Sequence, residues 1–166
     1  MTTNALKIAV LGTRGFPNVQ GGIESHCQHL YPLLAERGCE VTVFGRRPYL
    51  KSNVPYQYKG VTVVPLWCPK NKFLEAFVHT FLGLIAARRM KRGIVHVHAV
   101  GPSLLIPLAR ALGFKVVMTH HGPDYERKKW NRAAKMILKT GEYAGCRWAH
   151  EIIAITESIA LQIAQK

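Results

Sequence analysis

The sequence predicts an α/β fold, a Rossmann-like three-layer sandwich with a mainly parallel sheet. Short apolar runs alternate along the chain with longer amphipathic stretches, which is typical of repeated strand–helix–strand units. The first apolar run, residues 7–11, leads into a glycine-rich segment and then a helix-like stretch. The 166 residues, 48% of them hydrophobic, are enough to bury a layered core, so we expect one domain spanning residues 1–166.

Strands and helices are expected in alternation. The predicted strands are 7–11, 41–44, 61–65, 94–98, 115–119 and 151–155, and the predicted helices are 23–37, 71–92, 102–112, 126–149 and one from 157 onward. Gly38 predicts a left-handed end for the first helix, and Thr156 predicts an N-cap for the last. Pro32 and Pro107 predict a bend in their helices. The connection between residues 44 and 61 has room for a short extra strand.

Two of these helices have informative faces. The first is predicted to bury one stripe, made of Ile23, Cys27, Leu30 and Leu34. The helix 71–92 is apolar around most of its circumference, apart from a narrow face with Lys72, Glu75 and His79, and it ends in a basic run at 88–92. It is too short and too polar to span a bilayer, so it either packs on the sheet or lies on a membrane surface.

The segment 12–24 is rich in glycine and lies between a strand and a helix. Its glycines allow positive φ angles and close backbone approach. Gly21 and Gly22 directly precede the predicted helix, where free N–H groups and the helix dipole favour an anion. This arrangement predicts a turn that contacts phosphate and fits a diphosphate. The alternative is a surface loop whose glycines only make turns.

Further candidates follow the other strands. In an open parallel sheet, ligands bind outside the carboxyl ends of the strands. The segments at those ends are 12–24, Arg46 with Arg47, 98–101, 120–124 and 156–158. We expect their side chains to converge on one cleft, whereas the alternative for each is an ordinary turn built from polar, Gly and Pro residues.

The spacing of the glycines opposes two common nucleotide motifs. A nicotinamide-cofactor site needs a tight G-x-G-x-x-G and an acidic residue ending the second strand, whereas this loop is long and Arg46 and Arg47 stand there. The arginines would suit NADP, but the loop still does not match. A Walker loop is excluded, because no Gly-Lys-Ser or Gly-Lys-Thr follows the glycines.

Histidines gather near the ends of the fourth and fifth predicted strands. His96 and His98 lie on one face of a strand, which raises the possibility of a metal site, but no acidic partner stands at metal-site spacing and we expect no metal. His121 is the better functional candidate, because a neutral imidazole there can hydrogen-bond a sugar hydroxyl or a phosphate. The alternative is a turn histidine bonded to backbone.

The composition points to an anionic partner. Lys and Arg number 23 against 9 Asp and Glu, which gives a net charge of +14. No nucleic-acid partner is expected, since no helix-turn-helix, RNP or C₂H₂ pattern is present. The 4 cysteines form no C-x-x-C pair, and the first apolar run is too short for a signal peptide, so we expect a cytoplasmic protein with reduced thiols.

Several motifs together resemble a known family. GGIESH at 21–26, LAERGCEVTVF at 34–44, HVH at 96–98, VVMTHHG at 116–122 and EIIAITES at 151–158 stand in the order found in the N-terminal domain of family 4 glycosyltransferases, which have the GT-B fold. The resemblance covers nearly the whole chain. The stretches GTRGFP at 12–17 and DYERKKW at 124–130 look most like the bacterial rhamnosyltransferase subgroup.

The resemblance implies transfer of a sugar from a nucleotide-sugar, with retention of configuration and with no cofactor other than that co-substrate. It implies that Gly21 and Gly22 face the donor diphosphate and that His121, the expected catalytic residue, lies near the donor sugar. Glu24 would begin the helix behind the loop in a supporting role. We also expect substrate contacts from three residues near the strand ends, Arg14, His98 and Asp124.

The same resemblance implies partners outside this chain. The family's second, nucleotide-sugar-binding domain is expected to complete the site, and the acceptor is expected to be a saccharide or a polyprenyl-linked lipid in cell-surface polysaccharide synthesis. The basic end of the helix 71–92 suggests peripheral docking on an anionic inner membrane surface. The alternative function is a non-catalytic module that binds anions or docks on membranes.

Overall fold

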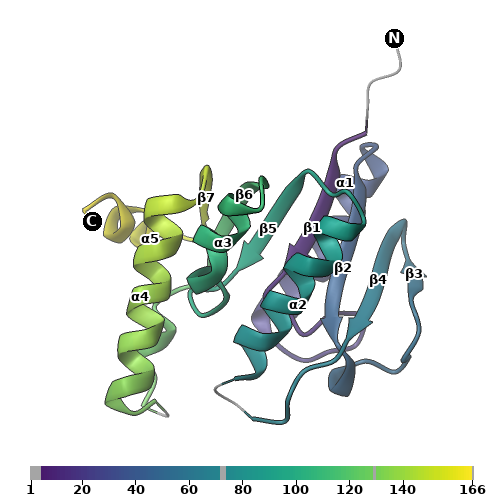
Figure 1. Ribbon diagram of the computed structural model, residues 1–166. Coiled ribbons are helices and arrows are strands. Elements are labelled where there is room, and N and C mark those ends of the chain that lie inside the picture. Colours follow the sequence, from purple (N-terminus) through teal and green to yellow (C-terminus); the bar gives the residue numbers. More distant parts are fainter. Residues whose placement is uncertain (1–4, 72–73, 129, 166) are drawn as a thin grey trace.

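The computed structural model describes residues 5–71, 74–128 and 130–165. Its centre is one seven-stranded sheet in the order β3-β4-β2-β1-β5-β6-β7 (Figure 1). All neighbouring strands pair in parallel except β3 and β4, which are antiparallel. The strands are β1 (Lys7–Leu11), β2 (Glu40–Arg46), β3 (Tyr56–Tyr58), β4 (Val61–Leu66), β5 (Ile94–His98), β6 (Lys115–His120) and β7 (Glu151–Ala154).

Helices cover both faces of the sheet, which makes the three-layer Rossmann-like sandwich that the sequence predicts. The α-helices are α1 (Gly22–Glu36), α2 (Glu75–Arg89), α3 (Ile106–Ala111), α4 (Arg132–Trp148) and α5 (Glu157–Ala164). Short 3₁₀ turns are η1 (Arg47–Tyr49), η2 (Pro102–Leu105) and η3 (Asp124–Glu126). In Figure 1, α2, α3 and α4 lie in front of the sheet and α1 lies behind it.

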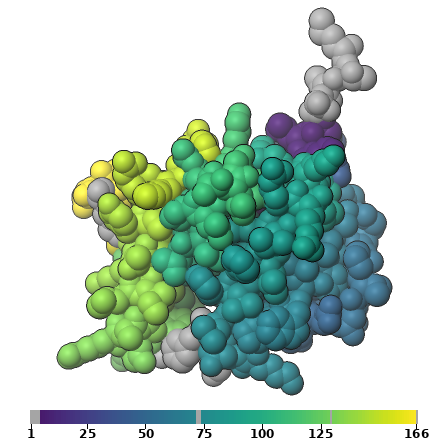
Figure 2. Space-filling view, viewed as in Figure 1, coloured from purple at the N-terminus to yellow at the C-terminus, as the bar shows by residue number. Residues whose placement is uncertain are grey.

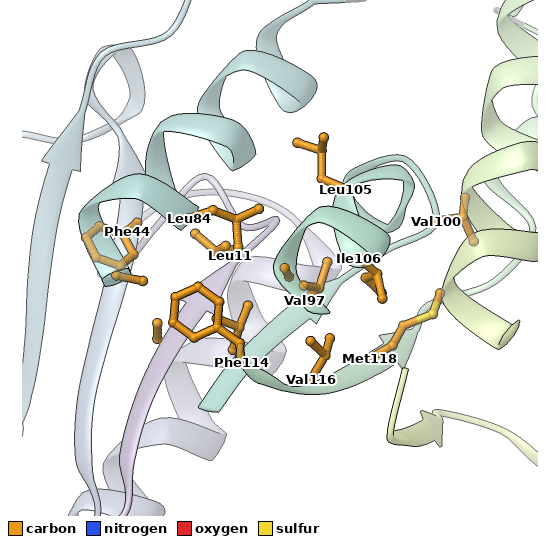
Figure 3. Close-up of a cluster of buried hydrophobic side chains, with 14 residues drawn as sticks. Leu11, Phe44, Leu84, Val97, Val100, Leu105, Ile106, Phe114, Val116 and Met118 are labelled. Carbon is orange, nitrogen blue, oxygen red and sulfur yellow. The ribbon is translucent and has the colours of Figure 1, made fainter. Parts of the chain in front are cut away.

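Each face has its own core, because successive side chains of a strand point to opposite faces. Ala9 and Leu11 of β1 pack with Leu84 of α2 and Ile106 of α3, in the cluster drawn in Figure 3. The other face of the same strand, with Ile8 and Val10, packs on Cys27 and Tyr31 of α1. Figure 2 shows the teal and green segments closing over the middle of the front face.

The strand order places a switch point between β1 and β5. On one side of β1 the sheet extends through β2 and β4 to the edge strand β3, and after β4 the chain crosses to β5 on the other side of β1. The segments that follow these two strands therefore leave the same edge of the sheet side by side. This is the place where open α/β sheets bind ligands.

Some element boundaries differ from the prediction. β2 continues to Arg46, and the stretch predicted as one helix over 102–112 is divided into η2 and α3. α4 begins only at Arg132, because the Asn131 side chain accepts a hydrogen bond from the Ala134 N–H and caps the helix there. The predicted start of the second helix at 71 includes positions 72 and 73, which lie outside the described residues, and α2 begins at Glu75.

The orientation of α2 also differs from the expected one. His79 is fully buried, and Glu75 forms an ion pair of 2.9 Å with Arg46 at the end of β2. Phe77 and Phe81 are instead 41% and 42% exposed. The polar face thus points inward, because the buried guanidinium of Arg46 needs a counter-charge there. Among the described residues, no helix combines the length and the apolar character needed to cross a membrane.

Candidate functional site

The loops after β1 and β5 meet in direct backbone contact. Gly12 has a φ of +92°, and a Cβ at this position would overlap the carbonyl group of His98. Only glycine satisfies both the positive φ and this close approach. The glycine-rich loop is therefore held against the end of β5, at the switch point of the sheet.

The same loop ends at the N-terminus of α1. Gly21 is the N-cap, and no side chain caps the helix there. Gly22 is exposed, and nothing lies within 4 Å of the place where its Cβ would be. The 15-residue helix thus begins without a side-chain cap and with open space beside Gly22, an arrangement that favours an anion.

Glu24 fixes the shape of this loop from behind. Its Oε1 atom accepts hydrogen bonds from the Arg14 N–H at 2.9 Å and from the Thr13 hydroxyl at 3.5 Å. Its other carboxylate oxygen fills the space where a Gly21 side chain would lie. Glu24 is buried in the first turn of α1, where the helix dipole also favours a carboxylate. This geometry gives Glu24 a supporting position inside the loop.

Arg14 lies along the outer side of the loop. Its guanidinium stands 5.0 Å from the centre of the Tyr49 ring and reaches the Gln20 carbonyl at 3.5 Å. Arg46, by contrast, is 9% exposed and paired with Glu75, so it does not reach the cleft as the sequence suggested. Arg14 is the arginine of this region that remains beside the loop.

Five side chains on the α1 face form a continuous chain of hydrogen bonds, which we call the relay. His96 Nε2 lies 2.7 Å from Thr119 Oγ1, and His96 Nδ1 lies 2.9 Å from the Tyr31 hydroxyl. The same hydroxyl lies 2.5 Å from His98 Nε2, and His98 Nδ1 lies 2.9 Å from His121 Nε2. His121 is the outer end of the relay and is partly exposed.

The imidazoles of the relay are neutral near pH 7. Burial lowers the pKa of His96 and of His121 to about 4 and that of His98 well below its usual value. Burial also raises the pKa of Tyr31 well above its usual value. His26 of α1 packs its ring 5.2 Å from the ring of His121, and burial lowers its pKa as well. The site therefore offers neutral hydrogen-bonding groups beside a helix N-terminus.

His98 departs from the prediction. Its side chain is fully buried and both ring nitrogens are bonded within the protein, so it supports His121 and does not face the cleft. Asp124 begins η3 and pairs with Arg127 at 2.8 Å.

A second buried pair stands next to His121. His120 Nε2 lies 2.8 Å from Glu142 of α4, and His120 Nδ1 accepts a hydrogen bond from the Gly122 N–H at 3.1 Å. Because Nδ1 accepts, Nε2 carries the hydrogen and donates a hydrogen bond to Glu142 Oε1. The Tyr125 hydroxyl also reaches Glu142, at 3.3 Å. These contacts hold the backbone on both sides of His121.

The histidines do not assemble into a metal site within the described part of the chain. No group of three or more His, Cys, Asp or Glu side chains there could hold a metal ion. His96 and His98 are stacked, with ring centres 4.4 Å apart, and their nitrogens are bonded to neighbouring side chains.

Sequence reasoning missed several residues of this site. Tyr31 was not singled out, although it lies one turn after Cys27 on the predicted buried side of the first helix. The roles of Thr119 and Glu142 carry no signal in the sequence, because each depends on a partner from a distant segment. A buried tyrosine, whose hydroxyl needs a partner, was the one available signal.

One protein family matches most of the chain. The model of Glycosyltransferase Family 4 matches residues 20–166. The chain belongs to glycosyltransferase family 4. Members of family 4 use nucleotide-sugar donors and transfer the sugar with retention of configuration. A search of curated protein sequences gave no match.

Solved structures similar to this family 4 chain share its fold. Sucrose-phosphate synthase from Thermosynechococcus elongatus matches with a TM-score of 0.77 and 15% identity, over 96% of this chain and 45% of that one. A trehalose-6-phosphate structure from E. coli with bound UDP-2-fluoro glucose matches with a TM-score of 0.56 and 13% identity, over 95% and 41%. This chain therefore corresponds to one half of a GT-B fold and spans less than half the length of these proteins.

Proposed function

We propose that this chain is the acceptor-side domain of a retaining glycosyltransferase, which transfers a sugar from a nucleotide-sugar to a saccharide or polyprenyl-linked acceptor. The observation that carries the proposal is the uncapped N-terminus of α1, which lies beside the neutral imidazole of His121 at the switch point of the sheet. The helix N-terminus favours an anionic diphosphate, and the neutral imidazole can hydrogen-bond a sugar hydroxyl.

Within this proposal, Gly21 and Gly22 face the donor diphosphate and His121 contacts the donor sugar. Arg14, which lies along the glycine loop, and Asp124, which follows β6, are proposed to contribute to substrate binding. Glu24 supports the loop from inside. A second domain is proposed to supply the remaining contacts to the nucleotide, so this chain alone is expected to be inactive.

The pathway is part of the proposal as well. The motifs at 12–17 and 124–130 favour a bacterial rhamnosyltransferase-like enzyme of cell-surface polysaccharide synthesis, acting in the cytoplasm at the inner face of the membrane. The sucrose-phosphate synthase likeness, at 15% identity, concerns the fold and leaves this choice of substrate to experiment.

A screen of donors tests the proposed activity. A protein that carries this chain together with a nucleotide-sugar-binding second domain is incubated with a broad panel of nucleotide-sugars, and released nucleotide is measured with and without acceptors. We expect one donor or a few related donors to be hydrolysed or transferred. Absence of both hydrolysis and transfer across the panel would contradict the enzymatic function.

The second candidate function is docking on an anionic membrane, and α4 provides a specific observation for it. Met136 and Ile137 are 72% and 56% exposed, and Arg132 and Lys139 are exposed on the same helix. The one acidic residue of α4, Glu142, is buried. Apolar side chains flanked by basic ones favour an interfacial helix. The basic end of α2 is expected to contribute less to membrane binding than the sequence suggests, because Arg92 is buried and paired with Glu40.

Vesicle co-sedimentation at low and high salt tests this second function. Three variants each replace three basic residues by glutamine: at α2 (Arg88, Arg89 and Lys91), at α4 (Arg132, Lys135 and Lys139), and at a control set elsewhere (Arg37, Lys51 and Lys115). All nine are exposed except Lys135, which is partly exposed. Each basic residue near an anionic leaflet contributes about 1 kcal/mol. We expect the α4 variant to lose binding and the control to keep it. Equal loss in all three variants, or no binding by the wild type, would contradict a defined docking helix.

A further inference from the structure

The relay restricts where its protons can be. A neutral imidazole has one N–H and one acceptor nitrogen, and a hydroxyl has one proton to donate. Each of the four contacts between Thr119, His96, Tyr31, His98 and His121 therefore needs one proton. Choosing the donor at one contact largely decides the donor at the next.

Two arrangements run in one direction along the whole relay. In the inward arrangement, His121 Nε2–H donates to His98, and the protons point on through Tyr31 and His96 to Thr119. In the outward arrangement, the Thr119 hydroxyl donates to His96, and the protons point on through Tyr31 and His98 to His121 Nε2. A third arrangement, in which both His96 and His98 donate to Tyr31, leaves the tyrosine proton without an acceptor.

The two buried hydroxyl groups of the relay select among these arrangements. Thr119 and Tyr31 are fully buried, and within the described residues their hydroxyl groups make no hydrogen bonds outside the relay. The inward arrangement leaves the Thr119 proton without an acceptor, and the third leaves the Tyr31 proton without one. An unsatisfied buried donor is costly. The outward arrangement gives every buried proton of the relay an acceptor.

We propose that the relay holds His121 in its Nδ1–H form, so that His121 presents a hydrogen-bond donor to the ligand, and that Tyr31 is the positioning residue that imposes this form. Nε2 of His121 is occupied by His98, and Nδ1 makes no hydrogen bond within the described part of the chain. Nδ1 is therefore the nitrogen left for a ligand.

This assignment sets the class of group that His121 recognises. A neutral Nδ1–H donates to an oxygen acceptor, such as a phosphate oxygen or a sugar hydroxyl oxygen, and it cannot act as a base at that nitrogen. Burial, which lowers the pKa of His121 to about 4, keeps the ring from becoming a cation at neutral pH. The nature of the ligand rests on the proposed function, whereas the tautomer of His121 does not.

Nitrogen-15 NMR of histidine-labelled protein at pH 7 tests the proposal without any ligand. Two-bond correlations to the ring protons distinguish Nδ1–H from Nε2–H, and the spectrum of a His121→Gln variant assigns the signal. We expect the Nδ1–H form for His121 in the wild type. In Tyr31→Phe no hydroxyl donates to His98 Nε2, so His98 is no longer held with its hydrogen on Nδ1. We therefore expect a mixture of both tautomers at His121. Tyr143→Phe, at a 66% exposed tyrosine outside the relay, should leave the wild-type pattern.

The outcomes separate clearly. An Nε2–H form for His121 in the wild type would overturn the proposal, whether or not Tyr31→Phe folds. An unchanged Nδ1–H form in a folded Tyr31→Phe protein would overturn the role of Tyr31. Because no donor turnover enters the measurement, failure of the donor screen leaves this result intact, and failure here leaves the screen intact.

Discussion

The carboxylate of Glu24 lies directly behind Gly21. A Cβ on Gly21 would overlap Glu24 Oε2, whereas nothing lies within 4 Å of the corresponding position on Gly22. Two adjacent glycines at the start of α1 therefore have different reasons for being glycine. The first makes room for the group that shapes the loop, and the second leaves the helix N-terminus open.

We predict that Gly21→Ala and Gly22→Ala differ in stability. Gly21→Ala forces Glu24 out of its hydrogen bonds and strains a φ of 153°, and we expect a loss of about 1–3 kcal/mol in the free energy of unfolding. Gly22→Ala is the matched control and should stay within about 0.5 kcal/mol of the wild type. Urea denaturation measures both. Equal stability of the two variants would contradict the packing of Glu24 against Gly21.

A second prediction concerns His79 and pH. Burial, with a contribution from the charge of Arg46, lowers the pKa of His79 to about 4, although the backbone of Gly45 acts in the opposite direction. Neither ring nitrogen has a partner in good hydrogen-bond geometry in the described part of the chain. The unfolded chain takes up a proton at this residue near pH 6.5, whereas the folded protein does so only near pH 4. Proton uptake at His79 therefore costs no stability above about pH 6.5, and it lowers the stability as the pH drops from about 6.5 to about 4.

Replacing His79 by leucine should remove that loss and two unsatisfied buried nitrogens. We expect His79→Leu to be at least as stable as the wild type at pH 7, and its advantage to grow by about 2 kcal/mol at pH 5. Urea denaturation at the two pH values measures the difference, with the exposed His29→Gln as control. A loss of stability at pH 7, or no change in the advantage at pH 5, would contradict an unpaired neutral His79.

Most of the fold could be predicted because its central strands are short, mainly apolar runs. β1, from Lys7 to Leu11, and β5, from Ile94 to His98, begin and end where the sequence places them. The prediction failed for the orientation of α2. Apolar side chains lie on all sides of this helix, so the sequence pattern does not show which side is buried. The ion pair between Arg46 and Glu75 determines the orientation of the helix. That pair joins residues 29 positions apart.

The site could be predicted in outline only. The glycine loop and His121 are predicted as site residues because they follow strands of a parallel sheet, where ligands bind, and their roles stay a prediction. The relay could not be predicted, since Tyr31 contacts histidines 65 and 67 positions away. His98 was predicted to contact substrate because it ends β5, but the side-chain alternation of that strand turns it toward α1 and buries it.

A third prediction concerns ligand binding by this chain alone. Because half of the proposed donor site belongs to a second domain, we expect nucleotide-sugars to bind this chain weakly or not at all. Isothermal titration calorimetry measures the dissociation constant. A submicromolar value, which corresponds to about 8 kcal/mol or more of binding free energy, would mean that this chain contains a complete site and would contradict the division into domains.

The most direct test of the account is the effect of His121 on turnover. In the two-domain protein, kcat/KM for the donor found by the screen is compared between the wild type, His121→Ala and the exposed control His29→Ala. Because a positioned hydrogen-bond donor typically contributes about 10²–10³-fold, we predict a loss of that size in His121→Ala and none in the control. Wild-type turnover in His121→Ala would contradict the claim that the end of β6 and the start of α1 form the donor-facing half of the site.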